Sequence, residues 1–277
     1  MKPIFSLAHL TTLTLTPPEM VSLAHRLSYD FASIRMLPAS PGGAAYPLMD
    51  DPAMLRDTIT RMDDTGTRIF DLELIRIDQH FNIESYLPFL ETGTQLGAQA
   101  VLVSGDDPDE ARMIDAYGRL CEAAWQQGLT ADLEFMPWTI INNISSAVRV
   151  VSAVNHPACG ILIDTLHFAR SNSRIEEIKA LPREWLHYAQ LCDAPSQAPS
   201  TAEGLIHAAR RDRLLPGEGE LDLAGIFRCL PPNLPISLEI PSDHRTSEIG
   251  YEQWARDVLT ASQAFIQGSC SPEPWPD

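Results

Sequence analysis

Four oxygen-bearing side chains stand at or near the ends of apolar runs in the second half of the sequence. The runs are LTADLEFMP, CGILIDTLHFAR, WLHYAQLCDAP and LPISLEIP, and the side chains are Glu134, Asp164, Gln190 and Glu239. Short apolar runs of this kind are typical of buried strands, and a carboxylate at the carboxyl end of such a strand indicates a site. The recurrence predicts that three carboxylates and one amide serve a single site.

A divalent cation would hold these groups together. Three carboxylates in a dry cleft repel one another unless a cation lies among them. An all-oxygen set without a thiolate is typical of hard cations, so we expect Mn²⁺ or Mg²⁺, with Co²⁺ tolerated and Zn²⁺ less favoured. Taken singly, each acid could instead cap a helix or form an ion pair. Four donors in register favour the ion site.

Further side chains near these positions suit catalysis and substrate binding. His167 follows Asp164 by three residues, so its ring can return to the same cavity as a general acid or base; the alternative is a loop histidine without a role. Arg76 and Arg210 are candidate anchors for an anionic substrate group, although ion pairing with the abundant acids is the commoner role of a single arginine. Trp138 either walls the pocket or packs, and packing is favoured.

The elements that must position these residues alternate along the chain. Strands are expected at residues 4–10, 31–37, 68–77 and 98–105, and four more end at Glu134, Asp164, Gln190 and Glu239. Helices are expected between them, whereas residues 203–223 are expected to form an extended connection. Such alternation predicts one α/β domain, a (β/α)8 TIM barrel over residues 1–267, rather than a doubly wound open sheet. The tail at residues 268–277 lacks periodicity and is expected to be disordered.

Composition excludes several classes of function. A net charge of −17 and a pI of about 4.7 would repel nucleic acid and anionic membranes, so small molecules are the expected partners. The two lysines, Lys2 and Lys179, lie away from the predicted strand ends, which excludes a Schiff-base mechanism. Five scattered cysteines fit reduced thiols, and neither a signal peptide nor a membrane-spanning run is recognised. We therefore expect a cytoplasmic location.

These residues together resemble a known family. The glutamate in LEFMPW, the acid and histidine in DTLHFAR, the run AQLCDAP and the glutamate in LEIP resemble the xylose-isomerase-like TIM barrels, the sugar phosphate isomerase/epimerase superfamily, over nearly the whole chain. Ketose 3-epimerases of that family usually carry His where this chain has Gln190. The 3-dehydroshikimate dehydratases resemble it in using Glu, Asp, Gln and Glu, but they differ at residues 135–138, FMPW.

The resemblance implies a reaction. The ion would hold a carbonyl or hydroxyl of a small hydroxylated keto substrate, which carries a carboxylate in the dehydratase case, and His167 or Glu134 would remove the α-proton. Glu239 is expected both to bind the ion and to be required for activity. Expulsion of a β-hydroxyl would make the enzyme a dehydratase, and return of the proton would make it an isomerase or epimerase.

The same fold is also compatible with other functions. Metal-dependent abasic-site endonucleases share it, but they need a basic groove and a histidine-rich zinc cluster, which this acidic chain lacks. A non-catalytic metal- or ligand-binding barrel is the remaining alternative. Members of the family are commonly oligomeric, so a homo-oligomer is among the expected states.

Overall fold

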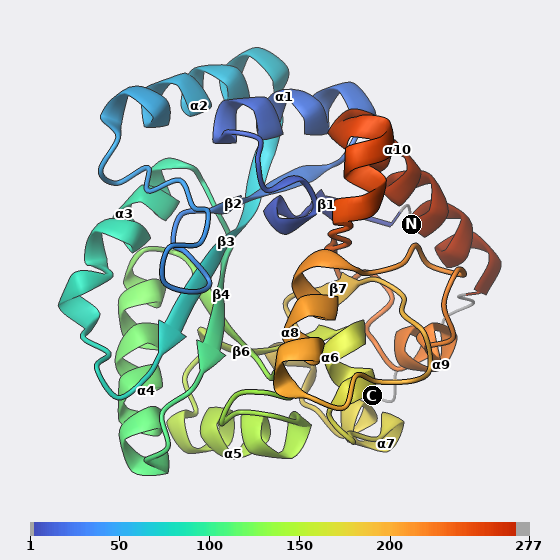
Figure 1. Ribbon diagram of the computed structural model, residues 1–277. Coiled ribbons are helices and arrows are strands. Elements are labelled where there is room, and N and C mark those ends of the chain that lie inside the picture. Colours follow the sequence, from blue (N-terminus) through green and yellow to red (C-terminus); the bar gives the residue numbers. More distant parts are fainter. Residues whose placement is uncertain (1–2, 270–277) are drawn as a thin grey trace.

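The computed structural model describes residues 3–269 and contains a closed barrel of eight parallel strands in the order β1 to β8 (Figure 1). This confirms the predicted (β/α)8 architecture. The strands are β1 Phe5–Leu7, β2 Phe31–Arg35, β3 Arg68–Ile77, β4 Ala100–Gly105, β5 Thr130–Glu134, β6 Cys159–Asp164, β7 Ala189–Leu191 and β8 Ile236–Leu238.

Helices surround the barrel and connect its strands (Figure 1). The α-helices are α1 Pro17–Leu27, α2 Pro52–Thr65, α3 Leu87–Gln95, α4 Glu110–Gln126, α5 Ile144–Val154, α6 Thr165–Arg170, α7 Ile175–Lys179, α8 Ala202–Arg211, α9 Leu223–Arg228 and α10 Asp243–Ser269. Short 3-10 turns lie at η1 His9–Thr12, η2 Ile83–Ser85 and η3 Arg183–Trp185. Within residues 3–269, none of the helices combines the length and the apolar character needed to cross a membrane.

Local sequence signals explain where these helices begin and end. The Asp51 side chain accepts hydrogen bonds from two amides of the first turn of α2, Pro52 opens that helix, and Gly66 ends it in a left-handed conformation. At α1, the Thr16 backbone N–H donates to the Glu19 carboxylate at 2.7 Å. Such caps fix the helices against the outer face of the barrel, where most of the apolar core lies.

Two segments differ from the expectation. Residues 202–211 form helix α8 instead of an extended connection, and helix α6 follows β6 at residues 165–170. Helix α10 begins at Asp243, has a non-helical break at Gly250 and runs through Ser269, so it includes the first two residues of the tail that is expected to be disordered. The rest of the predicted disordered tail, residues 270–277, lies outside the described residues.

The barrel interior holds both apolar and polar side chains. A separate cluster of buried apolar side chains fills part of it: Phe31, Phe70, Leu74, Ala100, Leu102, Leu162 and Tyr188. These positions come from β2, β3, β4 and β6 and from the residue before β7. Buried polar side chains lie on these strands too, for example Ser33 on β2 and Asp71 on β3. The acids predicted as ligands lie at or just beyond the carboxyl ends of their strands.

Candidate active site

The four predicted ion ligands come from four consecutive strands. Glu134 and Asp164 are the last residues of β5 and β6, Gln190 lies within β7, and Glu239 directly follows β8. Alternation along each strand turns these side chains into the barrel while their neighbours face the helices. All four are at most 4 % exposed, so they form a buried polar set.

Three side chains converge on one point at this end of the barrel. Glu134, Asp164 and His167 each offer a ligand atom, and these atoms lie within 4.8 Å of one another. Asp164 caps helix α6 by accepting the His167 backbone N–H at 2.9 Å, which turns the His167 ring back over the barrel. Its Nε2 lies 3.8 Å from Glu134 Oε1. The predicted return of His167 to this cavity is therefore seen, but through a helix rather than a loop.

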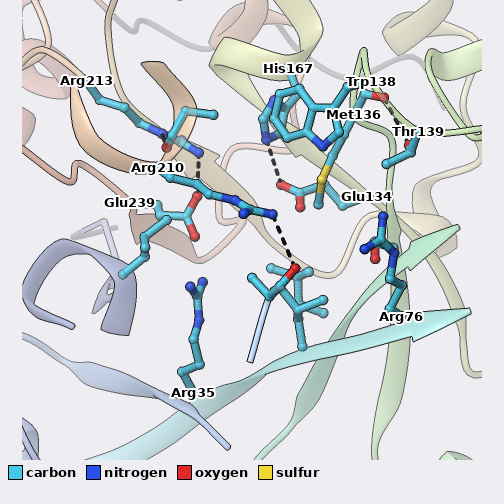
Figure 2. A pocket seen from close by; sticks show the side chains of 16 residues that line it. Arg35, Arg76, Glu134, Met136, Trp138, Thr139, His167, Arg210, Arg213 and Glu239 are labelled. Atoms are coloured by element: carbon cyan, nitrogen blue, oxygen red, sulfur yellow. Dashed lines mark hydrogen bonds and ion pairs between the residues drawn. The ribbon is translucent and has the colours of Figure 1, made fainter. Parts of the chain in front are cut away.

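Arg213 is part of the acid cluster. Its Nη1 donates to Asp164 Oδ2 at 2.6 Å. Its Nη2 donates to Glu239 Oε2 at 2.7 Å (Figure 2). The side chain is 1 % exposed, and its Nε donates to the Ala209 carbonyl of α8 at 2.7 Å. The structure thus places a buried guanidinium between two of the predicted ion ligands.

Side-chain atoms that could bind a cation are still available despite the ion pairs of Arg213 with Asp164 and Glu239. Glu134 Oε1, His167 Nδ1 and both side-chain amide atoms of Gln190 are buried without a hydrogen-bond partner among the described residues. Buried polar atoms are nearly always paired, so these orphaned atoms need a ligand or water. Their chemistry, with that of the neighbouring acids, fits a divalent cation bound mainly by oxygen.

Burial sets the charges at this cluster. Burial, with repulsion from Glu239 and Asp164, raises the pKa of Glu134 well above its usual range. Burial raises the pKa of Glu239 to about 7, against the opposing effect of Arg213. Burial lowers the pKa of His167 to about 4, so its ring is neutral at neutral pH. Without a cation, only protonation of the acids and the positive charge of Arg213 therefore offset the repulsion between the carboxylates.

A small cavity of about 40 Å³ lies above the cluster, and the predicted substrate residues line it (Figure 2). The Trp138 ring meets the His167 ring edge to face, with centroids 5.0 Å apart, so Trp138 both packs and walls the cavity. Arg76 also lines it, paired with Asp106 at 2.5 Å.

Arg210 separates this cavity from a larger one of about 460 Å³ that it also lines. Within residues 3–269 it forms no ion pair with a carboxylate; its Nη2 donates to the Ala39 carbonyl of the loop after β2 at 3.2 Å. Burial and the nearby guanidinium groups of Arg35 and Arg76 lower the pKa of Arg210. An arginine among like charges, held by one backbone oxygen, suits an incoming anion.

Comparison with known proteins gives the family. The model of the family described as xylose isomerase-like TIM barrel matches residues 28–264. The 3-dehydroshikimate dehydratase of Pseudomonas putida is 29% identical over 205 residues, which make up 71% of this chain and 29% of the relative. Inosose isomerase of Bacillus subtilis is 26% identical over 112 residues, 40% of this chain and 38% of the relative. The chain thus spans less than a third of the length of that dehydratase.

Solved structures agree on the fold. The IolI protein with a bound zinc atom superposes with a TM-score of 0.80 at 19% identity, covering 98% of this chain and 100% of that one. The probable 3-DHS dehydratase AsbF from Bacillus anthracis gives a TM-score of 0.71 at 16% identity, covering 98% and 100%. At these identities the likeness establishes the architecture alone.

Proposed function

The chain belongs to the xylose isomerase-like TIM barrel family, and from that premise we propose that it is a divalent-metal-dependent enzyme that removes a proton alpha to a carbonyl. The reaction we favour is dehydration of a substrate of the 3-dehydroshikimate type. The observation that carries the proposal is the convergence of Glu134, Asp164 and His167 within 4.8 Å beside orphaned buried donor atoms. The similarity to 3-dehydroshikimate dehydratases supports the same reaction.

In this proposal Glu134, Asp164, Gln190 and Glu239 hold the ion, as expected from the sequence. A bound divalent ion would polarise the substrate carbonyl and stabilise the negative charge that develops on its oxygen. Mn²⁺ and Mg²⁺ suit the oxygen donors best, and the zinc in the IolI structure makes Zn²⁺ a further candidate.

The remaining residues position the substrate and move protons. His167, with a neutral ring facing Glu134, accepts the α-proton, or Glu134 does so itself. A β-hydroxyl that receives a proton then leaves as water, and its carbon forms a double bond with the α-carbon. Trp138, in contact with the His167 ring, keeps solvent water away from that step.

Arg210 supports the dehydratase over the isomerase. Its guanidinium lies at the cavity and forms no ion pair with a carboxylate of residues 3–269, so it can turn from the Ala39 carbonyl to the carboxylate of a substrate. A neutral sugar has no anionic group that the Arg210 guanidinium could bind. The isomerase stays a second candidate because two inosose isomerases are also similar to this chain.

Turnover tests the proposal. Protein loaded with Mn²⁺ is incubated with 3-dehydroshikimate, and the ultraviolet absorbance of an aromatic product is followed. We expect product with the wild type, loss of activity in Glu239→Gln, and an increase in KM of about 100-fold in Arg210→Met, equivalent to about 2.7 kcal/mol. Arg211→Met is the matched control, because Arg211 forms an exposed ion pair with Asp243.

Three outcomes contradict parts of the proposal. Interconversion of free ketoses or inososes without aromatic product would replace the dehydratase with an isomerase. Absence of both reactions would reject these two activities and leave a binding protein or an enzyme with a different substrate. Unchanged metal content and activity in Glu239→Gln would refute the assigned ligands.

A further inference from the structure

Two cavities meet at a wall that they share. The inner cavity, of about 40 Å³, is lined by His167 among others, and none of the residues that line it is exposed. The outer cavity, of about 460 Å³, is lined in part by exposed residues of the loop after β2 and of helix α8. Four residues line both cavities, and we call them the neck: Leu10, Arg35, Ala39 and Arg210. A substrate that enters through the outer cavity therefore passes two guanidinium groups before it reaches His167.

Arg35 is the fixed side of the neck. It is the last residue of β2, and its Nε and Nη2 lie 2.8 and 2.6 Å from the same oxygen, Glu73 Oε2. His9 joins β2 and β3, because its backbone N–H donates to Glu73 Oε1 at 2.9 Å and its ring Nδ1 accepts the Arg35 backbone N–H at 2.8 Å. Since Nδ1 accepts, the ring proton is on Nε2, which donates to the Leu15 carbonyl at 2.8 Å. These bonds hold the Arg35 guanidinium in one position.

Arg35 also has hydrogen-bond donors left for a ligand. A guanidinium carries five N–H groups, and Glu73 takes only those on Nε and Nη2. Within the described part of the chain, Nη1 of Arg35 has no hydrogen-bond partner. Figure 2 shows the guanidinium pointing toward the side of the pocket where Arg210 and Glu239 lie. Nη1 is therefore available to an acceptor that enters the neck.

Arg210 is the movable side of the neck. Its Nη2 donates to the neutral Ala39 carbonyl at 3.2 Å, a weaker bond than one to a carboxylate. Burial, with repulsion from Arg35, lowers the pKa of Arg210, and an anion between the two guanidinium groups would offset that repulsion. Because Glu73 balances the charge of Arg35, Arg210 gives the neck one net positive charge. A planar monoanion such as a carboxylate matches this charge and can offer one oxygen to each guanidinium.

We propose that Arg35 and Arg210 form a clamp for the carboxylate of the substrate at the neck, with the reacting part of the substrate toward His167. Arg210 turns from the Ala39 carbonyl to one carboxylate oxygen, and Arg35, still paired with Glu73, donates its Nη1 to the other. This movement also displaces the side chain that separates the two cavities. The inference rests on the proposed function, which gives the substrate its carboxylate, and it adds Arg35 as a second substrate-binding residue.

Binding of a probe to the ion-free full chain tests the clamp without turnover. The probe is benzoate, benzamide is its neutral counterpart, and isothermal titration calorimetry with a chelator present measures the affinity for each. We expect the wild type to bind benzoate at least about 10-fold more tightly than benzamide, because hydrogen bonds to a charged acceptor are the stronger ones. Equal affinities for the two probes, or no binding of benzoate, would overturn the inference. Tighter binding of inorganic phosphate than of benzoate would also overturn it.

Variants separate the role of Arg35 from that of its ion pair. Arg35→Lys keeps a charge for Glu73 but has a single nitrogen, so it should weaken benzoate binding about 10-fold. Arg35→Met combined with Glu73→Gln removes the pair without leaving a buried charge and should weaken it by a similar factor. Glu73→Gln alone leaves the Arg35 charge unbalanced and should tighten it. Arg211→Met is the matched control on the same helix as Arg210, with an expected change of less than about 3-fold.

Turnover gives a second readout. In the Mn²⁺-loaded enzyme, Arg35→Lys should raise KM about 10-fold and change kcat less than about 3-fold, because the clamp binds a part of the substrate that does not react. Absence of turnover by the wild type would reject the proposed function, whereas benzoate binding would still decide the clamp. Equal affinity of Arg35→Lys and the wild type for benzoate, or weakening by Glu73→Gln as large as in the double variant, would reject the clamp and leave the proposed function standing.

Discussion

At the acid cluster, Arg213 supplies a positive charge that the sequence did not assign to this place. It pairs with Asp164 and Glu239 in a fully buried position, where the desolvation of charges is costly. Removing one partner of such a pair leaves an uncompensated buried charge. Arg213 is therefore expected to matter most for stability when no ion is bound.

We predict that Arg213→Met destabilises the ion-free protein by about 3–5 kcal/mol. Saturating Mn²⁺ should recover part of this loss, because the ion supplies the missing positive charge. Chemical denaturation with and without Mn²⁺ measures both effects. Arg211→Met, which removes an exposed ion pair, should change stability by less than about 1 kcal/mol. A similar small change in Arg213→Met would mean that its ion pairs contribute little.

A second, partly buried pair makes stability depend on pH. His187 Nδ1 lies 2.7 Å from Asp132 Oδ1; the His187 side chain is 24 % exposed and that of Asp132 is fully buried. Burial opposes protonation of the ring, but the Asp132 carboxylate outweighs it, so the pKa of His187 is raised above 6.5. A raised pKa in the folded state adds stability that is fully present below the unfolded-state pKa of about 6.5 and is lost as pH rises through the folded-state value.

We therefore predict that the His187–Asp132 pair contributes roughly 1 kcal/mol of unfolding free energy that is lost as pH rises from about 6 to 8, and that His187→Asn reduces the pH dependence by this amount. The buried acid Glu239, whose pKa is raised to about 7, titrates in the same range and leaves a remaining pH dependence in both proteins. Urea denaturation at several pH values measures it. His25→Asn, on the exposed side of α1, is the matched control. A pH profile of His187→Asn that matches the wild type would contradict the assignment.

Among the elements, helix α8 positions the cationic side of the site. Arg210 lies in its last turn, and Arg213 beyond it is tied to the Ala209 carbonyl. The helix is capped by Thr201, whose side chain accepts the Gly204 amide at 3.1 Å. Both arginines therefore depend on the path of one short helix.

We predict that Ala208→Pro lowers kcat/KM at least about 10-fold, because proline breaks the backbone bonding near the end of α8 and displaces both arginines. Ala208→Gly is the control, with an expected cost of only about 1 kcal/mol in helix stability. Circular dichroism should show an intact barrel in both variants. Full activity in Ala208→Pro would mean that α8 does not position the site.

The sequence identified elements where local chemistry marks their ends. The strand expected at residues 68–77 has the boundaries that the structure shows, because apolar residues dominate the run RIFDLELIRI. Local signals also mark α2, which begins after Asp51 at Pro52 and ends at Gly66. Helix α8 was missed although its apolar residues, Leu205, Ile206, Ala208 and Ala209, recur at helical spacing; only Ala209 among them is fully buried. Its cap Thr201 and its alanines were the available signals.

The candidate site was predictable only in part for a physical reason. The strand ends gave the positions of Glu134, Asp164, Gln190 and Glu239, because parallel strands share one carboxyl edge. The pairing of Arg213 with two of them depends on how α8 folds back over the barrel, which no local pattern encodes. Their binding of an ion stays a prediction.

For the whole molecule, ion binding should appear as added stability, because a ligand that binds only the folded chain shifts unfolding by mass action. At 100 times its dissociation constant, Mn²⁺ should add about 2.7 kcal/mol, which raises Tm by roughly 5–10 °C for a chain of this size. Differential scanning calorimetry measures the shift, and a chelator should reverse it. Glu134→Gln should reduce it strongly, and an equal shift in that variant would place the ion elsewhere.

The guanidinium within the acid cluster also bears on how a newly synthesised chain acquires its metal. Two of the acids receive a positive partner from the chain itself, so barrel closure need not wait for an ion from outside. The chain then binds its metal after folding. Which cation it binds depends on the concentrations of the available cations as much as on the intrinsic affinity of the site for each. The metal content of preparations should accordingly follow the growth medium of the producing host.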